Sequence, residues 1–302
     1  MATTPIEKLA GVLVALASPM QRDGSVDLDG VARLVEHVLA GGVRGLLALG
    51  STGETASLDE PARRQVLEAV ITATAGRVPV LCGVAQSQLS SVVAEVDAAA
   101  RAGADAVLVT PPYYYPTDQA GVAAFYRAVA ERSALPVLVY NIPQFTKVSI
   151  EPATLAALAR EGAVQGIKDS SRDFEYFEGV RVATRDMPAF RVFTGSDTML
   201  VASLAAGGAG TICGAANVAP DWVVHIYERF IDGDVAGARE GQERLYELVM
   251  TLRSGVFPLA IKSALHMRGV CGPWSAPPVR SLEEGLEARL RAQLARSGLL
   301  PD

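Results

Sequence analysis

Eight short apolar runs recur along the chain, and helical patterns fill the segments between them. The runs cover residues 12–16, 46–49, 78–81, 106–109, 137–140, 164–167, 191–193 and 211–212. Most of them lack polar alternation, which predicts strands covered on both faces, as in a parallel sheet. A strand, a loop and a helix repeated eight times predict an α/β fold of the (β/α)8 TIM-barrel type.

The segments between the runs have apolar residues at three- and four-residue spacing, as amphipathic helices do. One stripe consists of Leu28, Val31, Leu34, Val35 and Val38, and another of Val66, Leu67, Val70 and Ile71. Ser57 and Glu60 have the spacing of a capping box, and Pro61 follows them. We therefore expect a helix to start at this point.

The strand pattern stops near residue 232, while helical patterns continue over 236–252 and 258–267. Ser281 and Glu284 predict the start of a last helix, whose apolar stripe is Leu282, Leu286, Leu290 and Leu294. We predict a catalytic barrel domain over 1–232 and a C-terminal helical region over 233–302. A doubly wound sheet is disfavoured because no Gly-x-Gly-x-x-Gly turn follows the first run, which also disfavours a nicotinamide cofactor.

The charge distribution of the chain indicates what kind of molecule it binds, and its N-terminal pattern indicates where the protein is found. The 302 residues are 50% hydrophobic and 20% charged, with a formal net charge of −6 and no basic cluster. This distribution argues against nucleic acid or a membrane as partner and favours a small molecule. With neither a signal peptide pattern nor a long apolar stretch, we expect a cytoplasmic protein. The widely spaced Cys82, Cys213 and Cys271 predict buried reduced thiols.

Three polar clusters follow predicted strands, where the catalytic groups of a barrel lie. Residues 50–54 combine glycines with two hydroxyls that can hold an anion or relay a proton. Tyr140 ends the fifth run, where its phenol can act as a general acid or base or simply pack at the rim. Lys168 follows the sixth run directly.

Lys168 is the most informative of these residues. A lysine at the end of a buried strand must reach solvent, pair with a carboxylate or lose its proton, because desolvation lowers the pKa of an amine. The neutral amine attacks a ketone to form an imine, which serves as an electron sink without a metal. The alternative is an ion pair of Lys168 with Asp169 or Glu54.

At these positions the chain resembles the dihydrodipicolinate synthase and N-acetylneuraminate lyase superfamily. Three signatures of that superfamily are similar, in order and spacing, to Gly50-Ser51-Thr52-Gly53-Glu54, Tyr140-Asn141-Ile142-Pro143 and Gly166-Ile167-Lys168. Residues 110–116, 195–197 and 208–220 extend the resemblance over nearly the whole chain.

The resemblance implies a class I aldolase in which Lys168 forms a Schiff base with pyruvate and Tyr140 transfers protons. It implies that Ser51 links Tyr140 to Tyr113 of a neighbouring subunit. Thr52 and the adjacent backbone amide would hold the pyruvate carboxylate beside Gly50, and the carbonyl of Ile212 would line the pocket. The resemblance also implies a homotetramer and no cofactor.

Departures from the family pattern bear on the second substrate, an aldehyde or 2-oxo acid. Phe145 stands where synthases that use aspartate semialdehyde carry an arginine, and a phenyl ring cannot pair with a carboxylate. Ser51 replaces the threonine usual in those synthases, and Lys147 is a candidate contact for an acidic group. Lys168-Asp169-Ser170 differs from the Lys-x-Thr context of sialic acid lyases. The preferred hypothesis is cleavage or condensation of a 2-oxo-3-deoxy sugar acid or a 4-hydroxy-2-oxo acid.

Several alternatives stay open. A 4-hydroxy-tetrahydrodipicolinate synthase and a Schiff-base dehydratase would use the same lysine and tyrosine. A non-catalytic binding protein could keep the barrel, although such relatives commonly lose one of these two residues. A metal-dependent aldolase is disfavoured, and no metal is expected, because His37, His225 and His266 all fall in predicted helices rather than at strand ends.

Overall fold

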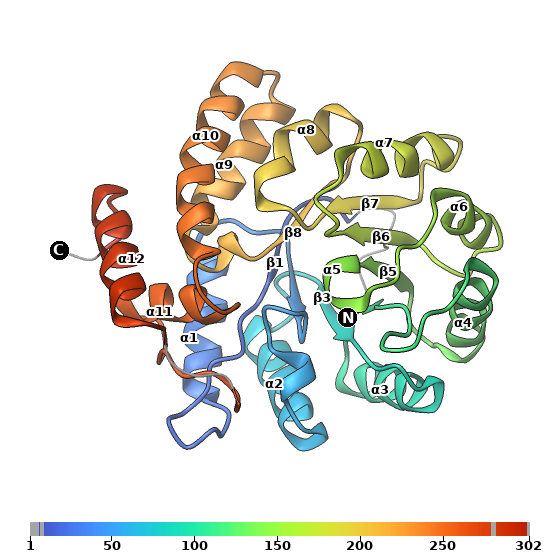
Figure 1. Ribbon diagram of the computed structural model, residues 1–302, viewed down its shortest axis with the longest axis horizontal. Helices are drawn as coiled ribbons and strands as arrows, with labels where there is room; N and C mark the ends of the chain where they lie inside the picture. The colour runs from blue at the N-terminus through green and yellow to red at the C-terminus, as the bar shows by residue number, and fades with distance from the viewer. Residues whose placement is uncertain (1–5, 7–8, 279–281, 301–302) are drawn as a thin grey trace.

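A computed structural model describes residues 6, 9–278 and 282–300 of the chain. Eight parallel strands close into a barrel in sequence order, from β1 to β8 and back to β1 (Figure 1). The strands are β1 Gly11–Ala15, β2 Gly45–Ala48, β3 Val80–Val84, β4 Ala106–Val109, β5 Val137–Asn141, β6 Gly166–Asp169, β7 Arg191–Thr194 and β8 Gly210–Cys213. The predicted TIM-barrel fold is confirmed.

Helices surround the barrel, and further helices follow its last strand (Figure 1). The surrounding helices are α1 Leu28–Ala40, α2 Glu60–Thr74, α3 Leu89–Ala102, α4 Gln119–Arg132, α6 Pro152–Arg160, α7 Phe174–Ala183, α8 Leu200–Ala205 and α9 Pro220–Ile231, while the short helix α5 Pro143–Thr146 follows β5 at the mouth of the barrel. Three 3₁₀ turns, η2 Thr55–Ser57, η3 Asp197–Met199 and η4 Ala215–Asn217, follow strand ends. The predicted C-terminal helices are α10 Val235–Leu252, α11 Leu259–Met267 and α12 Glu284–Arg296.

Successive residues of each strand face two different cores. In β1, Leu13 and Ala15 belong to the core inside the barrel, whereas Val12 and Val14 belong to the larger core between the sheet and the helices. Both faces of the sheet are shielded from water, which explains why the sequences of the strands are continuous apolar runs. A polar residue on the inner face near a strand's end therefore lies beside the mouth of the barrel.

Two strands, β3 and β6, start two residues later than expected. β3 starts at Val80 rather than residue 78, because Pro79 has no N–H to donate to the ladder. β6 starts at Gly166 and ends at Asp169, so Lys168 lies within the strand instead of just after it. Leu28 was expected in the apolar stripe of α1, but it is 52% exposed, and the buried face of that helix starts at Gly30.

The capping box predicted at Ser57 and Glu60 is wrong. Asp59 is the N-cap of α2, and its carboxylate accepts a hydrogen bond of 2.9 Å from the backbone N–H of Ala62. Ser57 lies in η2 instead, because the aspartate directly before the helix is the better placed acceptor. Glu284 is the first residue of α12 and follows an N-cap at Glu283, while Ser281 lies outside the described residues.

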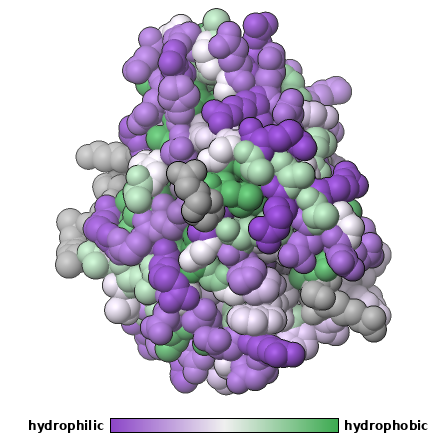
Figure 2. All heavy atoms as spheres, turned by 90° about the vertical axis from the view of Figure 1, so that its left-hand side faces the viewer, coloured by the Kyte–Doolittle hydropathy of each residue, from purple (hydrophilic) through white to green (hydrophobic). Residues whose placement is uncertain are grey.

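The C-terminal helices cover one side of the barrel. α10 packs against α9, and α11 and α12 pack against each other. The face that they present is mostly hydrophilic, with hydrophobic atoms in small areas (Figure 2). Leu290 and Leu294 of α12 are buried, and Leu282 and Leu286 also contact the core. Among the described residues, no helix is both long enough and apolar enough to cross a lipid bilayer.

All three cysteines are buried and free, as predicted. Burial raises the pKa of the Cys82 thiol to about 12 and that of Cys271 to about 11. Both thiols are therefore protonated and unreactive near neutral pH.

Candidate active site

Lys168 and Tyr140 are neighbours across the β5–β6 ladder. The two residues are paired in register on parallel strands, and Tyr140 belongs to the inner core of the barrel. The Lys168 ammonium Nζ lies 3.3 Å from the Tyr140 hydroxyl and 4.4 Å from the centre of its ring. Both side chains are buried. The sheet itself thus sets an amine and a phenol within hydrogen-bond distance.

The two carboxylates that could have paired with Lys168 bind other groups. Asp169 accepts hydrogen bonds from Asn141 Nδ2 at 2.8 Å and from the Ser171 hydroxyl at 2.9 Å. Burial raises the pKa of Asp169, although these hydrogen bonds oppose the shift. Glu54 pairs instead with Lys262. Within the described part of the chain, no carboxylate oxygen lies within 4 Å of Lys168 Nζ, so no ion pair neutralises it.

The loop after β2 brings Ser51 to the same point. The Ser51 hydroxyl lies 3.2 Å from that of Tyr140, so Lys168, Tyr140 and Ser51 form a continuous polar chain. The loop is a tight turn in which the N–H of Gly53 bonds to Gly50 O at 3.0 Å. Thr52, at the centre of this turn, is 5% exposed.

Two contacts anchor the end of this turn to the C-terminal region. Glu54 has a left-handed backbone conformation, with φ of 57°, and its carboxylate forms an ion pair with Lys262 of α11. Glu54 Oε2 also accepts a hydrogen bond of 2.9 Å from the N–H of Ala276. The helices that follow the barrel therefore help to fix the active-site turn.

A cavity of about 250 Å³ opens beside Lys168. Six of the eight residues singled out from the sequence line it, namely Ser51, Thr52, Tyr140, Phe145, Lys168 and Ile212. Gly50 is not part of the lining and supports the turn through its carbonyl. Tyr113 lines an adjoining cavity of about 320 Å³, which shares Ser51 and Phe145 with the first.

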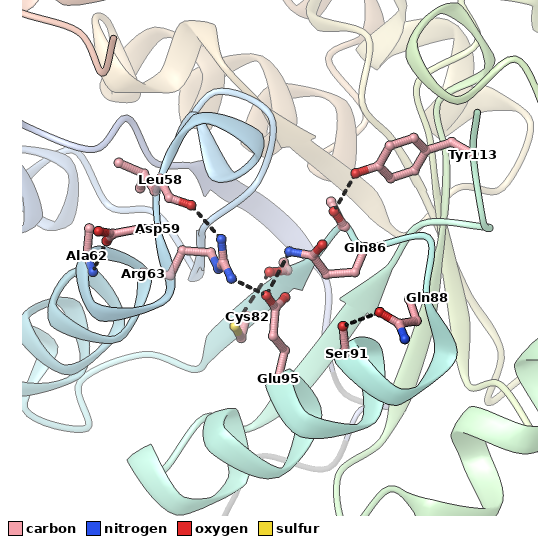
Figure 3. A network of polar contacts seen from close by, with 12 residues as sticks. Leu58, Asp59, Ala62, Arg63, Cys82, Gln86, Gln88, Ser91, Glu95 and Tyr113 are labelled. Atoms are coloured by element: carbon pink, nitrogen blue, oxygen red, sulfur yellow. Dashed lines mark hydrogen bonds and ion pairs between the residues drawn. The ribbon is translucent and has the colours of Figure 1, made fainter.

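Tyr113 is held by the loop between β3 and α3 of its own chain. Its hydroxyl donates to Ala85 O at 3.1 Å, and its carbonyl accepts from the Ser87 hydroxyl at 2.7 Å. Figure 3 shows the adjacent network, in which Gln86 Nε2 and Arg63 both contact Glu95 Oε1, at 2.9 and 2.7 Å. Within one chain Tyr113 does not contact Ser51, so the expected relay would require a second subunit.

Gly195, at the end of β7, leaves room for the lysine side chain. A Cβ atom at this position would lie 2.8 Å from Lys168 Cε and would also collide with the Ser170 hydroxyl. Such contacts are shorter than packed carbon atoms tolerate. A glycine is therefore needed here to let Lys168 extend into the cavity.

Sequence reasoning missed other charged residues of the cavity. Arg172, Asp197 and Arg253 line it together with Lys168. Arg172 and Asp197 follow β6 and β7, so the rule that barrel strand ends carry function could have found them. Nothing in the sequence links Arg253, at the end of α10, to this site.

Lys147 was a candidate contact for an acidic group, with a solvated loop lysine as the preferred alternative. It is exposed and lies outside the cavity lining, and its Nζ donates to Gln144 O at 2.9 Å. Within the described ranges, no group of three or more His, Cys, Asp and Glu residues could hold a metal ion.

The sequence pattern of the Dihydrodipicolinate synthetase family matches residues 8–297. The chain belongs to this family. Membership confirms the predicted enzyme class, a carbon–carbon lyase of the class I, pyruvate-dependent aldolase type, and agrees with the polar chain found at the barrel mouth.

Relatives within the dihydrodipicolinate synthetase family match this member over nearly its full length. An uncharacterized DapA-like lyase of Halobacterium salinarum is 38% identical over 97% of this chain and 95% of its own. A 4-hydroxy-tetrahydrodipicolinate synthase of Hyphomonas neptunium is 36% identical over 96% and 98%. The structure of YagE, a prophage protein of E. coli K12 solved in complex with pyruvate, matches with a TM-score of 0.93 and 29% identity, covering 97% and 99%.

Proposed function

We propose that this enzyme is a lyase that holds a 2-oxo acid as a Schiff base on Lys168, with pyruvate as one reaction partner. The observation that carries the proposal is the buried Lys168 amine, which lies 3.3 Å from the Tyr140 hydroxyl with no carboxylate partner in the described chain. The pyruvate bound by the structural neighbour YagE supports the choice of 2-oxo acid.

In the direction of condensation, the reaction starts from the free Lys168 amine. The Lys168 amine attacks the ketone carbon of pyruvate, and the resulting carbinolamine loses water to give an iminium ion. Loss of a C3 proton yields an enamine, whose C3 attacks an aldehyde carbon, and the new alkoxide takes up one proton. Water then releases the 4-hydroxy-2-oxo acid and restores the amine. Cleavage follows the same steps in reverse.

Tyr140 and Ser51 supply the proton transfers in this proposal. The Tyr140 hydroxyl lies close to both Lys168 Nζ and the Ser51 hydroxyl, so it can donate a proton to the carbinolamine oxygen and pass protons on to Ser51. In a homotetramer, Tyr113 of a neighbouring subunit would extend this relay. Thr52 and its adjacent backbone amide are proposed to hold the pyruvate carboxylate, and Ile212, which lines the same cavity, is proposed to contribute its carbonyl.

The proposed substrate is a 2-oxo-3-deoxy sugar acid or a 4-hydroxy-2-oxo acid. Phe145 is 55% exposed, lines the cavity and packs 6.2 Å from the ring of Phe257, so position 145 offers a second substrate no charge. The Hyphomonas relative is a 4-hydroxy-tetrahydrodipicolinate synthase, which keeps that activity as a second candidate. Product analysis separates the aldolase from a dehydratase, which would release water but no pyruvate.

The test is reductive trapping. The enzyme is incubated with pyruvate and borohydride, and the adduct is located by intact and peptide mass spectrometry, with Lys168→Ala as the control. A reduced pyruvyl group on Lys168 is expected, together with pyruvate release from at least one 4-hydroxy-2-oxo or 2-oxo-3-deoxy acid. An unmodified Lys168 in a folded protein would refute the proposal.

A further inference from the structure

Directly behind the catalytic pair, Asn141 and Asp169 face each other across the same β5–β6 ladder. Each is the last residue of its strand and follows its catalytic neighbour by one position, so the register pairs Asn141 with Asp169 just as it pairs Tyr140 with Lys168. Because successive side chains of a strand point to opposite faces, these two lie on the outer face of the sheet, away from the cavity. Both are almost completely buried, and the steps proposed above use neither of them.

A side-chain hydrogen bond joins the two strands at this point. Asn141 Nδ2 donates to Asp169 Oδ1 at 2.8 Å, and Asn141 Oδ1 accepts from the N–H of Ile150 at 3.3 Å. The bond lies one residue beyond Tyr140 and Lys168, where the regular strands end. In addition to the backbone ladder, it therefore restrains the two strand ends that carry the phenol and the amine.

The Asp169 carboxylate also holds the loop that follows β6. Its Oδ1 accepts from the N–H of Ser171 at 3.1 Å, and its Oδ2 accepts from the Ser171 hydroxyl at 2.9 Å. The Ser171 hydroxyl oxygen in turn accepts from the N–H of Asp173, the N-cap of α7. Ser170 and Arg172 of this loop line the catalytic cavity. The hydrogen bonds on the outer face thus extend through the loop to the cavity wall.

Asp169 is a residue whose burial costs stability. Burial raises the pKa of its carboxyl group, hydrogen bonds from Asn141 and Ser171 oppose the rise, and the charge of Asp173 adds to it. Among the described residues, no lysine, arginine or histidine forms an ion pair with this carboxylate. Apolar residues of similar volume often replace buried charges without loss of stability. Stability therefore does not account for an aspartate at this position, whereas the geometry of its hydrogen bonds does.

We propose that Asn141 and Asp169 are positioning residues for the reaction at Lys168. Their mutual hydrogen bond fixes the Tyr140 hydroxyl relative to Lys168 Nζ, and the bonds between Asp169 and Ser171 fix the loop that lines the cavity. Neither residue touches the substrate, and both act through hydrogen bonds rather than through charge. A shift of about 1 Å in a reacting group can cost about 10²-fold in rate, so such restraint has a large effect. This inference rests on the proposed Schiff-base function and adds the residues that keep the amine and the phenol in place.

Exchange of the pyruvate methyl protons for deuterium gives a readout that needs no second substrate. In the proposed reaction the iminium ion loses a C3 proton to give the enamine. In deuterium oxide the reverse step returns a deuteron to C3, and water then releases deuterated pyruvate. Proton NMR, corrected for exchange without enzyme, gives the maximal rate and the pyruvate concentration at half-maximal rate. The maximal rate reports the placement of Lys168 and Tyr140, whereas the half-maximal concentration also reports the cavity wall.

Three variants remove the hydrogen bonds. Asn141→Leu breaks the bond between the strands, and its maximal exchange rate should fall about tenfold or more while the half-maximal concentration changes less than about threefold. Ser171→Ala breaks the bond from the loop hydroxyl, and it should raise the half-maximal concentration about fivefold with a maximal rate within about twofold of wild type. Asp169→Ala removes both sets of bonds and should show both effects. It also tests the bond between the strands if Asn141→Leu does not fold.

Asp169→Asn separates hydrogen bonding from charge. Its carbonyl oxygen can still accept from Asn141 and from the N–H of Ser171, and its amide can donate to the Ser171 hydroxyl oxygen. Both exchange constants should therefore stay within about threefold of wild type, a rescue relative to Asp169→Ala. Tyr126→Phe is the structural control, since it removes a buried hydrogen bond of 2.8 Å to Val109 O behind the neighbouring strand β4. It should lower stability and leave both exchange constants unchanged.

Exchange at the wild-type rate in folded Asn141→Leu, or in Asp169→Ala if the first variant does not fold, would overturn the proposal. An Asp169→Asn variant as slow as Asp169→Ala would also overturn it, because the charge would then be responsible, and so would an equal loss in Tyr126→Phe. An unchanged half-maximal concentration in Ser171→Ala would overturn the part that concerns the loop. In all these cases exchange by the wild type would still support the lyase. A wild type that neither exchanges the methyl protons nor forms a reduced adduct on Lys168 would refute the proposed function, and this inference with it.

Discussion

Glu54 and Lys262, 208 positions apart in the chain, form an ion pair in which both side chains are almost completely buried. The pair joins the turn that carries Ser51 and Thr52 to helix α11. Lys262 Nζ also donates to Trp274 O at 2.8 Å. Burial lowers the pKa of the Lys262 ammonium, and Glu54 opposes that shift. This charged contact, together with the hydrogen bond from Ala276, ties the C-terminal region to the active-site turn.

Breaking this pair should destabilise the protein strongly. Glu54→Gln or Lys262→Met leaves an unpaired buried charge, and each should lower the free energy of unfolding by about 3–5 kcal/mol. The double variant should lose less than the sum of the two. Urea unfolding measures these losses of free energy. In the variants that remain folded, half-maximal trapping on Lys168 should require a higher concentration of pyruvate. Additive losses would contradict a direct coupling between the two residues.

Tyr140→Phe should slow catalysis without abolishing Schiff-base formation. The hydroxyl that bridges Lys168 and Ser51 is lost, while the ring that packs in the barrel remains. Turnover should fall by about 10²–10⁴-fold, the usual contribution of a general acid or base. Long incubation with pyruvate and borohydride should still modify Lys168. A variant with wild-type turnover would remove Tyr140 from the mechanism.

Gly195→Ala should impair Lys168 through crowding alone. The added methyl group would lie 2.8 Å from Lys168 Cε, which forces the lysine side chain or β7 to shift. We expect a loss of about 1–3 kcal/mol in stability and slower trapping of pyruvate. Gly285→Ala is the matched control, since its Cβ would meet no atom within 4 Å. If the two variants had the same stability and the same rate of pyruvate trapping, the space beside Lys168 would be large enough for a methyl group.

Glu95 should make stability depend on pH. Burial raises its pKa above 4.5, although Arg63 and Gln86 oppose the shift. Between pH 4.5 and the raised pKa, the carboxyl group of Glu95 binds more protons in the folded state than in the unfolded state. The stabilisation that this proton binding provides is therefore fully present at lower pH and is lost as the pH rises through the folded-state pKa. Relative to Glu95→Gln, the wild type should therefore lose unfolding free energy as the pH rises over that window.

Urea unfolding of both proteins between pH 4 and pH 8 measures the difference. Glutamine keeps a carbonyl that can accept the hydrogen bond from Gln86, so the comparison isolates the titration. A difference between the two proteins that stays constant with pH would show that Glu95 has the same pKa in both states.

The sequence was sufficient to predict the barrel, because strands covered on both faces leave continuous apolar runs. It also predicted that Lys168 and Tyr140 lie near the mouth, since parallel strands all end on one side. Their facing positions in adjacent strands depend on register, which a single chain does not specify locally. The Glu54–Lys262 pair and the placement of Arg253 depend on how distant segments pack, so no local pattern revealed them.

Helix starts were predicted less well for a related reason. The spacing of Ser57 and Glu60 fits a capping box, yet the aspartate next to the helix takes the role, because only the final backbone geometry decides which side chain reaches the free N–H groups. For Lys147 the sequence left two interpretations open, a solvated loop lysine or a substrate contact, and the exposed side chain, which turns back onto Gln144, agrees with the first.

The in-register pairing of Tyr140 with Lys168 places the catalytic pair on the strands, apart from the loops and helices that complete the cavity lining. The hydrogen-bonded ladder fixes the spacing of the amine and the phenol, whereas Phe145, Arg172 and Arg253 all lie beyond the strands, on segments that can change without disturbing it. Mutation can therefore retune which molecule is cleaved while the bond-breaking groups stay in place. Enzymes built on this scaffold can therefore share one reaction and act on different substrates.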